Sequence, residues 1–167
     1  MMERIKNILD STLKVILVVL IAGMTFNVLW QVFTRFVLQN PSSYTEELAR
    51  YSLVWAGILG AAYVAGQKMH LAIDLLLMNL DGNKKLLVEI VIQAFIFLFS
   101  SSVMVVGGLR LVNITLTLNQ LSAALQIPLG YVYLVLPLSG TIICFYSLFF
   151  ISRNIKEMSA NPAEKKV

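Results

Sequence analysis

Charge is scarce in this chain of 167 residues. Asp, Glu, Lys and Arg together make up 13% of the residues, whereas 58% are hydrophobic and the mean hydropathy is +0.80. A soluble domain of this length could not bury so much apolar surface, so lipid must form part of its solvent. The composition therefore predicts an integral membrane protein.

Residues that build reactive sites are also few, because Cys144 is the only cysteine and His70 is the only histidine. An internal disulfide, a cysteine metal cluster and a haem held by two histidines are therefore excluded. The chain has no phosphate-binding glycine loop, no H-E-x-x-H zinc motif and no nucleophile with a base nearby. We therefore expect no catalytic residue, no metal and no cofactor in this chain.

The apolar residues lie in long runs, and we divide them into four membrane-spanning helices. The expected fold is all-α, with a single membrane domain over residues 1–167. The expected spans are about 15–36, 45–67, 86–110 and 128–151, preceded by a basic lead-in over 1–14 and followed by a polar tail over 152–167.

The 13 lysines and arginines outnumber the nine acidic residues, and they flank the apolar runs. They form no basic face with interleaved aromatic residues, so membrane orientation explains them better than nucleic-acid binding. If both termini are cytoplasmic, the basic residues on the outer side are only Arg35, Arg50 and Arg110. The positive-inside rule therefore predicts a multi-pass protein with cytoplasmic N- and C-termini.

The connector after the second span has a helical pattern of its own. Over residues 69–80, the polar residues His70 and Asp74 fall on one side and leucine, isoleucine and methionine on the other. This pattern predicts a short amphipathic helix that lies in the membrane interface. The lysines at the level of the lipid headgroups would be Lys68, Lys84 and Lys85. A metal or proton-relay site at His70 and Asp74 would need further ligands, so we favour a structural role.

The first span carries one narrow polar stripe. Gly23, Asn27, Gln31 and Arg35 recur every four residues and so share one face of a helix. This face should contact protein instead of lipid, either the chain's own helices or a partner subunit.

The entrance to the second span combines a capping motif with charge. Ser43-x-x-Glu46 fits a capping box, which predicts that a helix begins here. Glu46 stands four residues before Arg50, the favourable order for an ion pair on one helix face.

Small residues recur at intervals of four along the same span. One line is Gly57-x-x-x-Ala61-x-x-x-Ala65, and Ala56-x-x-x-Gly60 is a neighbouring line. Small residues at this spacing let helix backbones approach closely inside a membrane, so we expect this helix to pack against another.

The second half of the chain has few charges. Glu89 lies in the first turn of the third span, where a proton-coupling role is possible in principle, but its place near the interface favours a structural one. Residues 113–127 are too polar to face lipid throughout and are expected to form a helix end and an interfacial loop. Pro128 should begin the last span, and Pro137 should kink it.

Several of these motifs together resemble a known family. The segments are Glu46-Glu47-Leu48-Ala49-Arg50-Tyr51, Val54-Trp55, Gly60-Ala61-Ala62-Tyr63, His70 with Ile73-Asp74, and the run from Ile127 to Pro137. They are similar to the signature of the small membrane subunit, the DctQ-type Q subunit, of tripartite ATP-independent periplasmic (TRAP) transporters. The resemblance covers nearly the whole chain.

The resemblance implies a place in a bacterial inner-membrane complex. A soluble periplasmic protein would deliver an organic acid to a heterodimer of this chain and a large multi-span permease subunit. The large subunit would hold the substrate and sodium sites of this symport, and the small one would act as a scaffold that braces it. Family members serve sialic acids such as N-acetylneuraminate, C4-dicarboxylates and other carboxylates. For this chain we expect a sialic acid or a C4-dicarboxylate as the substrate before any other carboxylate.

The predicted partner-contact residues combine this signature with the polar stripe and the small-residue lines. They are Asn27, Gln31, Arg35, Glu46, Glu47, Arg50, Trp55, Gly57, Gly60 and Ala61. Glu46 and Glu47 should either pair with Arg50 and Arg35 or receive basic groups of a partner. The outer loops 36–44 and 111–127 are expected to dock the periplasmic protein.

The competing interpretation is a self-sufficient, homo-oligomeric four-helix transporter. Such a protein would need an acid deep inside a span. Glu89 comes nearest to this requirement, but it lies at a predicted helix end.

Overall fold

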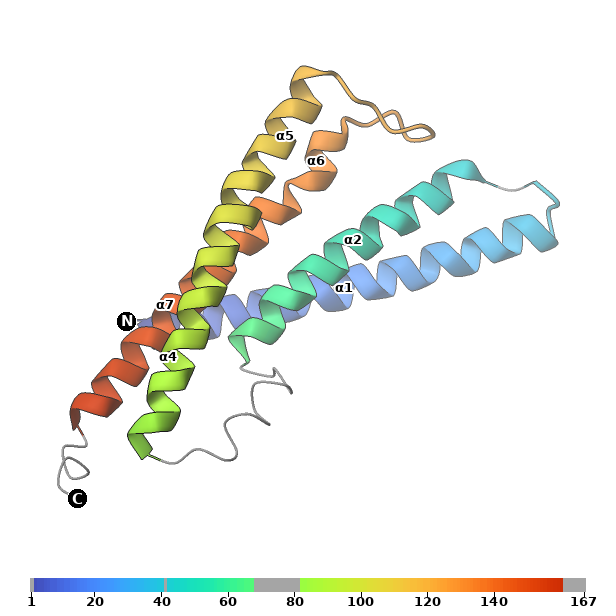
Figure 1. Ribbon diagram of the computed structural model, residues 1–167. Helices are drawn as coiled ribbons and strands as arrows, with labels where there is room; N and C mark the ends of the chain where they lie inside the picture. The colour runs from blue at the N-terminus through green and yellow to red at the C-terminus, as the bar shows by residue number, and fades with distance from the viewer. Residues whose placement is uncertain (1, 41, 68–81, 161–167) are drawn as a thin grey trace.

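The computed structural model describes residues 2–40, 42–67 and 82–160 (Figure 1). In chain order the helices are α1 (Met2–Phe36), α2 (Ser43–Gly66), α4 (Gly82–Phe99), the π-helix η1 (Ser100–Gly107), α5 (Gly108–Thr117), α6 (Leu129–Tyr133) and α7 (Val135–Ala160). Within these described ranges no strand forms, and the only β-type contact is an isolated bridge between Leu121 and Pro128. The all-α prediction is confirmed.

Among the described residues, four helices are long and apolar enough to cross a membrane, as predicted. α1 and α2 are two of them. The third is continuous over Lys84–Thr117, through α4, η1 and α5, and the fourth runs over Leu129–Ser159, through α6 and α7. A helix rises 1.5 Å per residue, so the third span, about 50 Å long, extends beyond a hydrocarbon core of roughly 30 Å.

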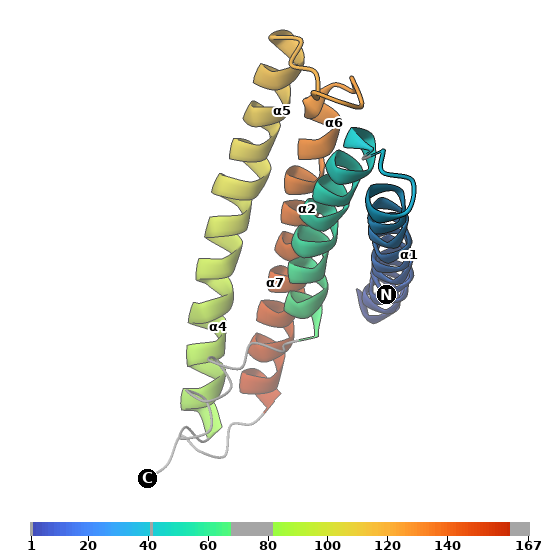
Figure 2. The ribbon, with the colours of Figure 1, turned by 90° about the vertical axis from the view of Figure 1, so that its right-hand side faces the viewer.

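The helices form two antiparallel pairs. α1 packs along α2, and the continuous α4–η1–α5 helix packs along α6 and α7. Figure 2 shows α2 and α7 side by side between the outer helices α1 and α4. We call the end with the α1–α2 connection and residues 118–128 the loop end, and the opposite end, where α4 begins and α7 finishes, the terminal end.

The two pairs cross near the terminal end and diverge toward the loop end (Figure 1). The main buried cluster lies where α1, α2 and α7 meet. It consists of Leu13, Leu59, Val135, Tyr146, Phe149 and Phe150. The pairs are therefore held together by apolar packing at one end and need other contacts at the loop end.

α1 includes the basic lead-in, which we predicted as a separate segment. The helix begins at Met2 and runs without interruption into the apolar span, for 35 residues in all. Lys6 and Asp10 stand one turn apart in this lead-in and form a salt bridge that supports the helix.

The last span is interrupted at Leu134, as the position of Pro137 predicts. Pro137 has no N–H and cannot bond the carbonyl of Tyr133 four residues earlier, so α6 ends at Tyr133 and α7 begins at Val135. The N–H of Leu134 still donates to the Gly130 carbonyl, at 3.1 Å, which keeps the chain helical before the break.

The π-helix η1 begins at three consecutive serines. The Oγ of Ser100 donates to the carbonyl of Ile96 at 2.8 Å, and the Oγ of Ser102 donates to the carbonyl of Leu98 at 2.6 Å. Such side-chain bonds compete with the backbone ladder for carbonyl groups, which favours the wider π turn.

Part of the predicted structure lies outside the described residues. This holds for the interfacial helix over 69–80 with Lys68, His70 and Asp74, and for the tail from residue 161 onward. Lys84 and Lys85 are described, and both are exposed at the start of α4.

Candidate functional site

α1 and α2 share a partly buried seam whose residues alternate three and four apart. On α1 the seam consists of Leu13, Leu17, Leu20, Met24, Asn27, Gln31 and Thr34. This is the spacing of a coiled-coil contact. The Asn27 side-chain amide donates to the Thr45 carbonyl of α2 at 2.7 Å. Of the predicted polar stripe, Asn27 and Gln31 thus lie in the seam, whereas Gly23 and Arg35 are exposed.

The predicted capping box at Ser43 is wrong. The N-cap is Ser42, with extended backbone angles and no side-chain capping bond, and Ser43 is the first helical residue. Glu46 does not reach back to the cap but pairs with Arg50 at 3.1 Å, and both side chains are about two-thirds exposed, at 64% and 68%. The predicted ion pair is therefore present, whereas the predicted cap is not.

Glu47 joins the start of α2 to the segment that precedes α6. Its carboxylate accepts the backbone N–H groups of Ala123, Ala124 and Leu125 at 3.0, 2.8 and 2.8 Å. The Tyr51 hydroxyl, one turn along α2, donates to the same carboxylate at 2.7 Å. We call the contact between Glu47 and the backbone of Ala123, Ala124 and Leu125 the Glu47 clamp. Glu47 is thus satisfied inside the chain by backbone donors, and among the described residues no basic side chain pairs with it.

The segment that Glu47 binds is itself tightly folded. The Ser122 N–H donates to the Ile127 carbonyl at 2.9 Å, and the Leu129 N–H donates to the Gln120 carbonyl at 2.9 Å. Asn119 and Gln126 adopt left-handed backbone angles, with φ of 48° and 56°. The predicted outer loop therefore contains a compact turn, and three of its backbone N–H groups donate to Glu47.

One face of α2 points away from every other described helix. Glu46, Arg50, Leu53, Gly57 and Ala61 follow one another at intervals of three or four, and all are exposed. A side chain added at Gly57 would meet nothing within 4 Å. We call this line the open face of α2.

The other predicted residues of α2 lie on different sides. Gly60 faces α1, where Leu17 lies 4.0 Å from the position of an added Cβ. Trp55 is half-buried and lines a cleft next to α6. Ala62 and Gly66 are buried. The two small-residue lines thus differ, because Gly60 faces α1 while Gly57 and Ala61 remain open.

A polar cluster near the terminal end was missed by the sequence analysis. The hydroxyl of Tyr146, a residue only 1% exposed, donates to the Asp10 carboxylate at 2.6 Å, and Lys6 pairs with Asp10 as well. The Tyr146 ring covers Gly66 so closely that an added Cβ would lie 2.6 Å from it. The Lys6–Asp10 spacing predicts an ion pair, but nothing in the apolar run around Tyr146 indicates its partner.

Glu89 has a partner on the last helix. The side-chain amide of Asn154, a residue 1% exposed, donates to the Glu89 carboxylate at 2.8 Å. This contact supports the structural role that its position near the helix start suggested. Within the described residues, no group of three or more His, Cys, Asp and Glu could hold a metal ion.

Residues 12–157 match the protein family described as tripartite ATP-independent periplasmic transporters, DctQ component. A Haemophilus influenzae protein named as a TRAP transporter small permease protein is 21% identical over 160 residues, which cover 92% of this chain and 98% of that protein.

Two further relatives carry the names of substrates. The sialic acid TRAP transporter small permease protein SiaQ of Vibrio cholerae is 24% identical over 106 residues, 64% of this chain and 61% of SiaQ. The isethionate TRAP transporter permease protein DctMQ of Oleidesulfovibrio alaskensis is 27% identical over 129 residues, 72% of this chain and 20% of that longer protein.

Proposed function

Because the chain belongs to the DctQ component family of tripartite ATP-independent periplasmic transporters, it is a small permease subunit, and we propose that it braces a large permease subunit. The chain is a multi-pass membrane protein of a bacterial system. We propose that it lies in the inner membrane and that both termini are cytoplasmic. The loop end then faces the periplasm.

The open face of α2 is the observation that carries this proposal. Gly57 and Ala61 are exposed small residues in a span, and such residues let a second helix approach closely. Exposed Glu46 and Arg50 continue the same line at the loop end, where they can meet polar groups of the partner. We therefore assign this face to the large subunit.

A brace must keep its shape while the transporting subunit moves. Polar contacts join the two helix pairs at both ends, through the Glu47 clamp at the loop end and through Tyr146 and Asp10 near the terminal end. These contacts support a rigid role for the small subunit. In this proposal the large subunit carries the sodium and substrate sites.

The longer relative supports the choice of partner. Its name is permease protein DctMQ, and this chain matches only 20% of its length, so most of it is additional protein. We propose that an equivalent large permease subunit pairs one to one with this chain as a separate polypeptide. A periplasmic binding protein would dock at the loop end, on the turn that Glu47 holds.

The substrate in our proposal is an organic acid, with a sialic acid or a C4-dicarboxylate first. The substrates named for the two relatives described above, sialic acid and isethionate, are both organic anions. Because these relatives share the small subunit but differ in substrate, we assign the selection to the other components.

Co-purification tests the proposal directly. The chain is expressed with the large permease subunit from the same genome, captured in mild detergent through a tag on either subunit, and analysed for stoichiometry. We expect a one-to-one complex whose uptake of an organic acid requires sodium and the periplasmic protein. Recovery of this chain alone as a homo-oligomer would contradict the proposal and favour the self-sufficient transporter.

Substitutions then locate the contact face. Gly57→Leu and Ala61→Leu should lower recovery of the large subunit about tenfold, because a bulky side chain keeps the helices apart. Gly23→Leu is the matched control, since Gly23 is an equally open glycine on α1. Equal recovery with Gly57→Leu and with the unchanged chain would remove α2 from the interface.

A further inference from the structure

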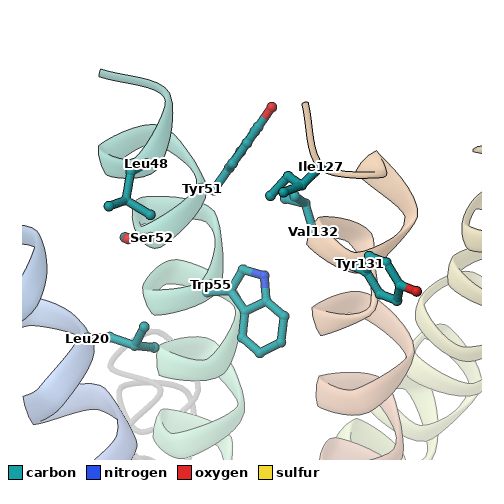
Figure 3. A pocket seen from close by; sticks show the side chains of 8 residues that line it. All are labelled: Leu20, Leu48, Tyr51, Ser52, Trp55, Ile127, Tyr131 and Val132. Carbon is teal, nitrogen blue, oxygen red and sulfur yellow. The ribbon is translucent and has the colours of Figure 1, made fainter. Parts of the chain in front are cut away.

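A pocket lies between the first turn of α1 and the second half of α7, near the terminal end. Its volume is about 350 Å³, within the range of roughly 300–1,000 Å³ that is usual for ligand pockets. The cleft beside Trp55 has no charged residue in its lining (Figure 3). This pocket, in contrast, combines apolar, polar and charged side chains, which are Met2 and Glu3 of α1 and Phe149, Ser152, Arg153 and Lys156 of α7.

The α7 residues of the pocket share one helix face. Phe149, Arg153 and Lys156 follow one another at intervals of four and three, the spacing that aligns side chains along a helix. Phe149 belongs to the main buried cluster and forms the apolar base of the pocket. The Arg153 Cζ lies 5.6 Å from the centre of the Phe150 ring, a cation–π contact that holds the guanidinium at this face.

Arg153 and Lys156 have no acidic partner among the described residues. The salt bridges there join Lys6 to Asp10 and Arg50 to Glu46, and Glu3 forms none with either cation of the pocket. The two positive charges and the one negative charge in the lining leave a net charge of +1. A single phosphodiester group carries one negative charge and would neutralise this lining.

The pocket lies where the apolar part of the last span ends. No residue between Arg110 and Arg153 is charged, so Arg153 is the first charged side chain that this span reaches. Arg153 follows the start of the span at Leu129 by 24 residues, about 36 Å along a helix, whereas the hydrocarbon core is roughly 30 Å thick. Arg153 and Lys156 are both exposed, and this length places them at the level of the lipid headgroups.

We propose that this pocket binds the phosphate of an anionic phospholipid between Arg153 and Lys156. The guanidinium fork of Arg153 fits two phosphate oxygens, and the Lys156 ammonium adds a compact positive charge. The Ser152 hydroxyl provides a further donor on the same face. One turn toward the membrane centre, Leu148 is 47% exposed and offers an apolar surface to an acyl chain, which a free phosphate would not use.

This inference goes beyond the proposed bracing of a large subunit and does not depend on it, because this chain alone forms the pocket. Native mass spectrometry of the full chain tests it, with equal amounts of phosphatidylglycerol and zwitterionic phosphatidylethanolamine in the micelles. We expect the chain to retain one phosphatidylglycerol in clear excess over phosphatidylethanolamine. Arg153→Gln combined with Lys156→Gln should lower this retention about fivefold for each cation removed.

Lys84→Gln combined with Lys85→Gln is the matched control. Both lysines are exposed at the same end of the molecule but lie outside the pocket lining, so this variant loses the same charge elsewhere. It should retain phosphatidylglycerol as the unchanged chain does. Equal losses in the two double variants would overturn the proposal, because general attraction to a basic surface would then explain the lipid. Equal retention of the two lipids by the unchanged chain would also overturn it.

Thermal unfolding in detergent distinguishes a lipid from a free phosphate. Added phosphatidylglycerol should raise the melting temperature of the unchanged chain by mass action, whereas inorganic phosphate at the same concentration should not. The rise should be absent in the variant that lacks both pocket cations. An equal rise with inorganic phosphate would overturn the lipid assignment.

A second pair of variants keeps the test valid if removal of both cations weakens the fold. Lys156→Arg preserves the positive charge and should retain phosphatidylglycerol, whereas Lys156→Gln should retain about fivefold less. Equal retention by these two variants would contradict the site.

Discussion

Two adjacent carboxylates, Glu46 and Glu47, have different environments. Glu46 pairs with Arg50 in solvent-exposed surroundings, where an ion pair contributes little to stability. Glu47 accepts three backbone N–H groups from a segment more than 70 residues away in the sequence. A carboxylate that accepts several N–H groups forms stronger bonds than a neutral amide would. Glu47 should therefore determine the position of the turn before α6.

Glu47→Gln should loosen this turn, because an uncharged amide accepts the N–H groups of Ala123 to Leu125 more weakly. Hydrogen exchange followed by mass spectrometry should show severalfold faster exchange for these amides in the full chain. Glu46→Gln is the control and should leave their exchange unchanged. Identical protection in both variants would mean that the turn holds its shape without the Glu47 carboxylate.

Tyr146 is the second residue whose role depends on a distant partner. Tyr146→Phe removes the bond to Asp10 and leaves a carboxylate with one partner fewer in a mostly buried place. The expected loss is about 1–2 kcal/mol of unfolding free energy. Thermal unfolding in detergent should show it as a lower melting temperature, and Tyr44→Phe, at an exposed position, should cause no change.

At the scale of helices, glycine marks the places where backbones come closest. An added Cβ at Gly140 of α7 would lie 2.7 Å from the Cβ of Met104 in η1, and one at Gly108 of α5 would lie 2.9 Å from the Cδ of Pro137. After the break at Leu134, α7 can thus follow the third span closely. Gly57 on α2, in contrast, faces open space.

The contrast between these glycines gives a paired prediction. Gly140→Leu should destabilise the isolated chain by about 1–3 kcal/mol, the usual cost of overpacking a tight contact. Gly57→Leu should leave the isolated chain as stable as before and act only on assembly with the large subunit. Melting temperatures of both variants in detergent test this, and equal destabilisation would show that Gly57 is packed inside the chain.

For the whole molecule, the number of spans determines the relation between the two termini. Four spans place the N- and C-termini on the same side of the membrane. The loop end then carries Arg35, Arg50 and Arg110, and most of the other basic residues gather at the terminal end. From this distribution we propose that the terminal end faces the cytoplasm, as the positive-inside rule predicts.

Reporter fusions at the two termini test this orientation. A fluorescent protein that folds only in the cytoplasm should be active at both ends, and alkaline phosphatase, which needs the periplasm, should be inactive at both. Alkaline phosphatase inserted after Asn119, in the turn of the loop end, is the positive control. Opposite results at the two termini would rule out four spans.

Local features of the sequence predicted the helices. Apolar runs of sufficient length determine spans because an unsatisfied backbone is too costly in lipid, and Pro137 interrupts its helix because it lacks an N–H. The Glu46–Arg50 pair follows from a spacing of four residues. The π-helix and the missing cap at Ser43 were not predicted, because both depend on how several side chains compete for the same backbone groups.

The sequence by itself predicted four apolar helices long enough to cross a membrane, and its motifs indicated the transporter family. Only the tertiary structure decided that Glu47 binds backbone N–H groups, that Asp10 meets Tyr146 and that Gly57 faces outward while Gly60 faces α1. Every residue except proline has a backbone N–H, so the residue types at 123–125 give no sign that they bind Glu47. Asp10 and Tyr146 are 136 residues apart in the sequence, so no local spacing connects them. Such contacts depend on how the two helix pairs pack, which no local pattern specifies.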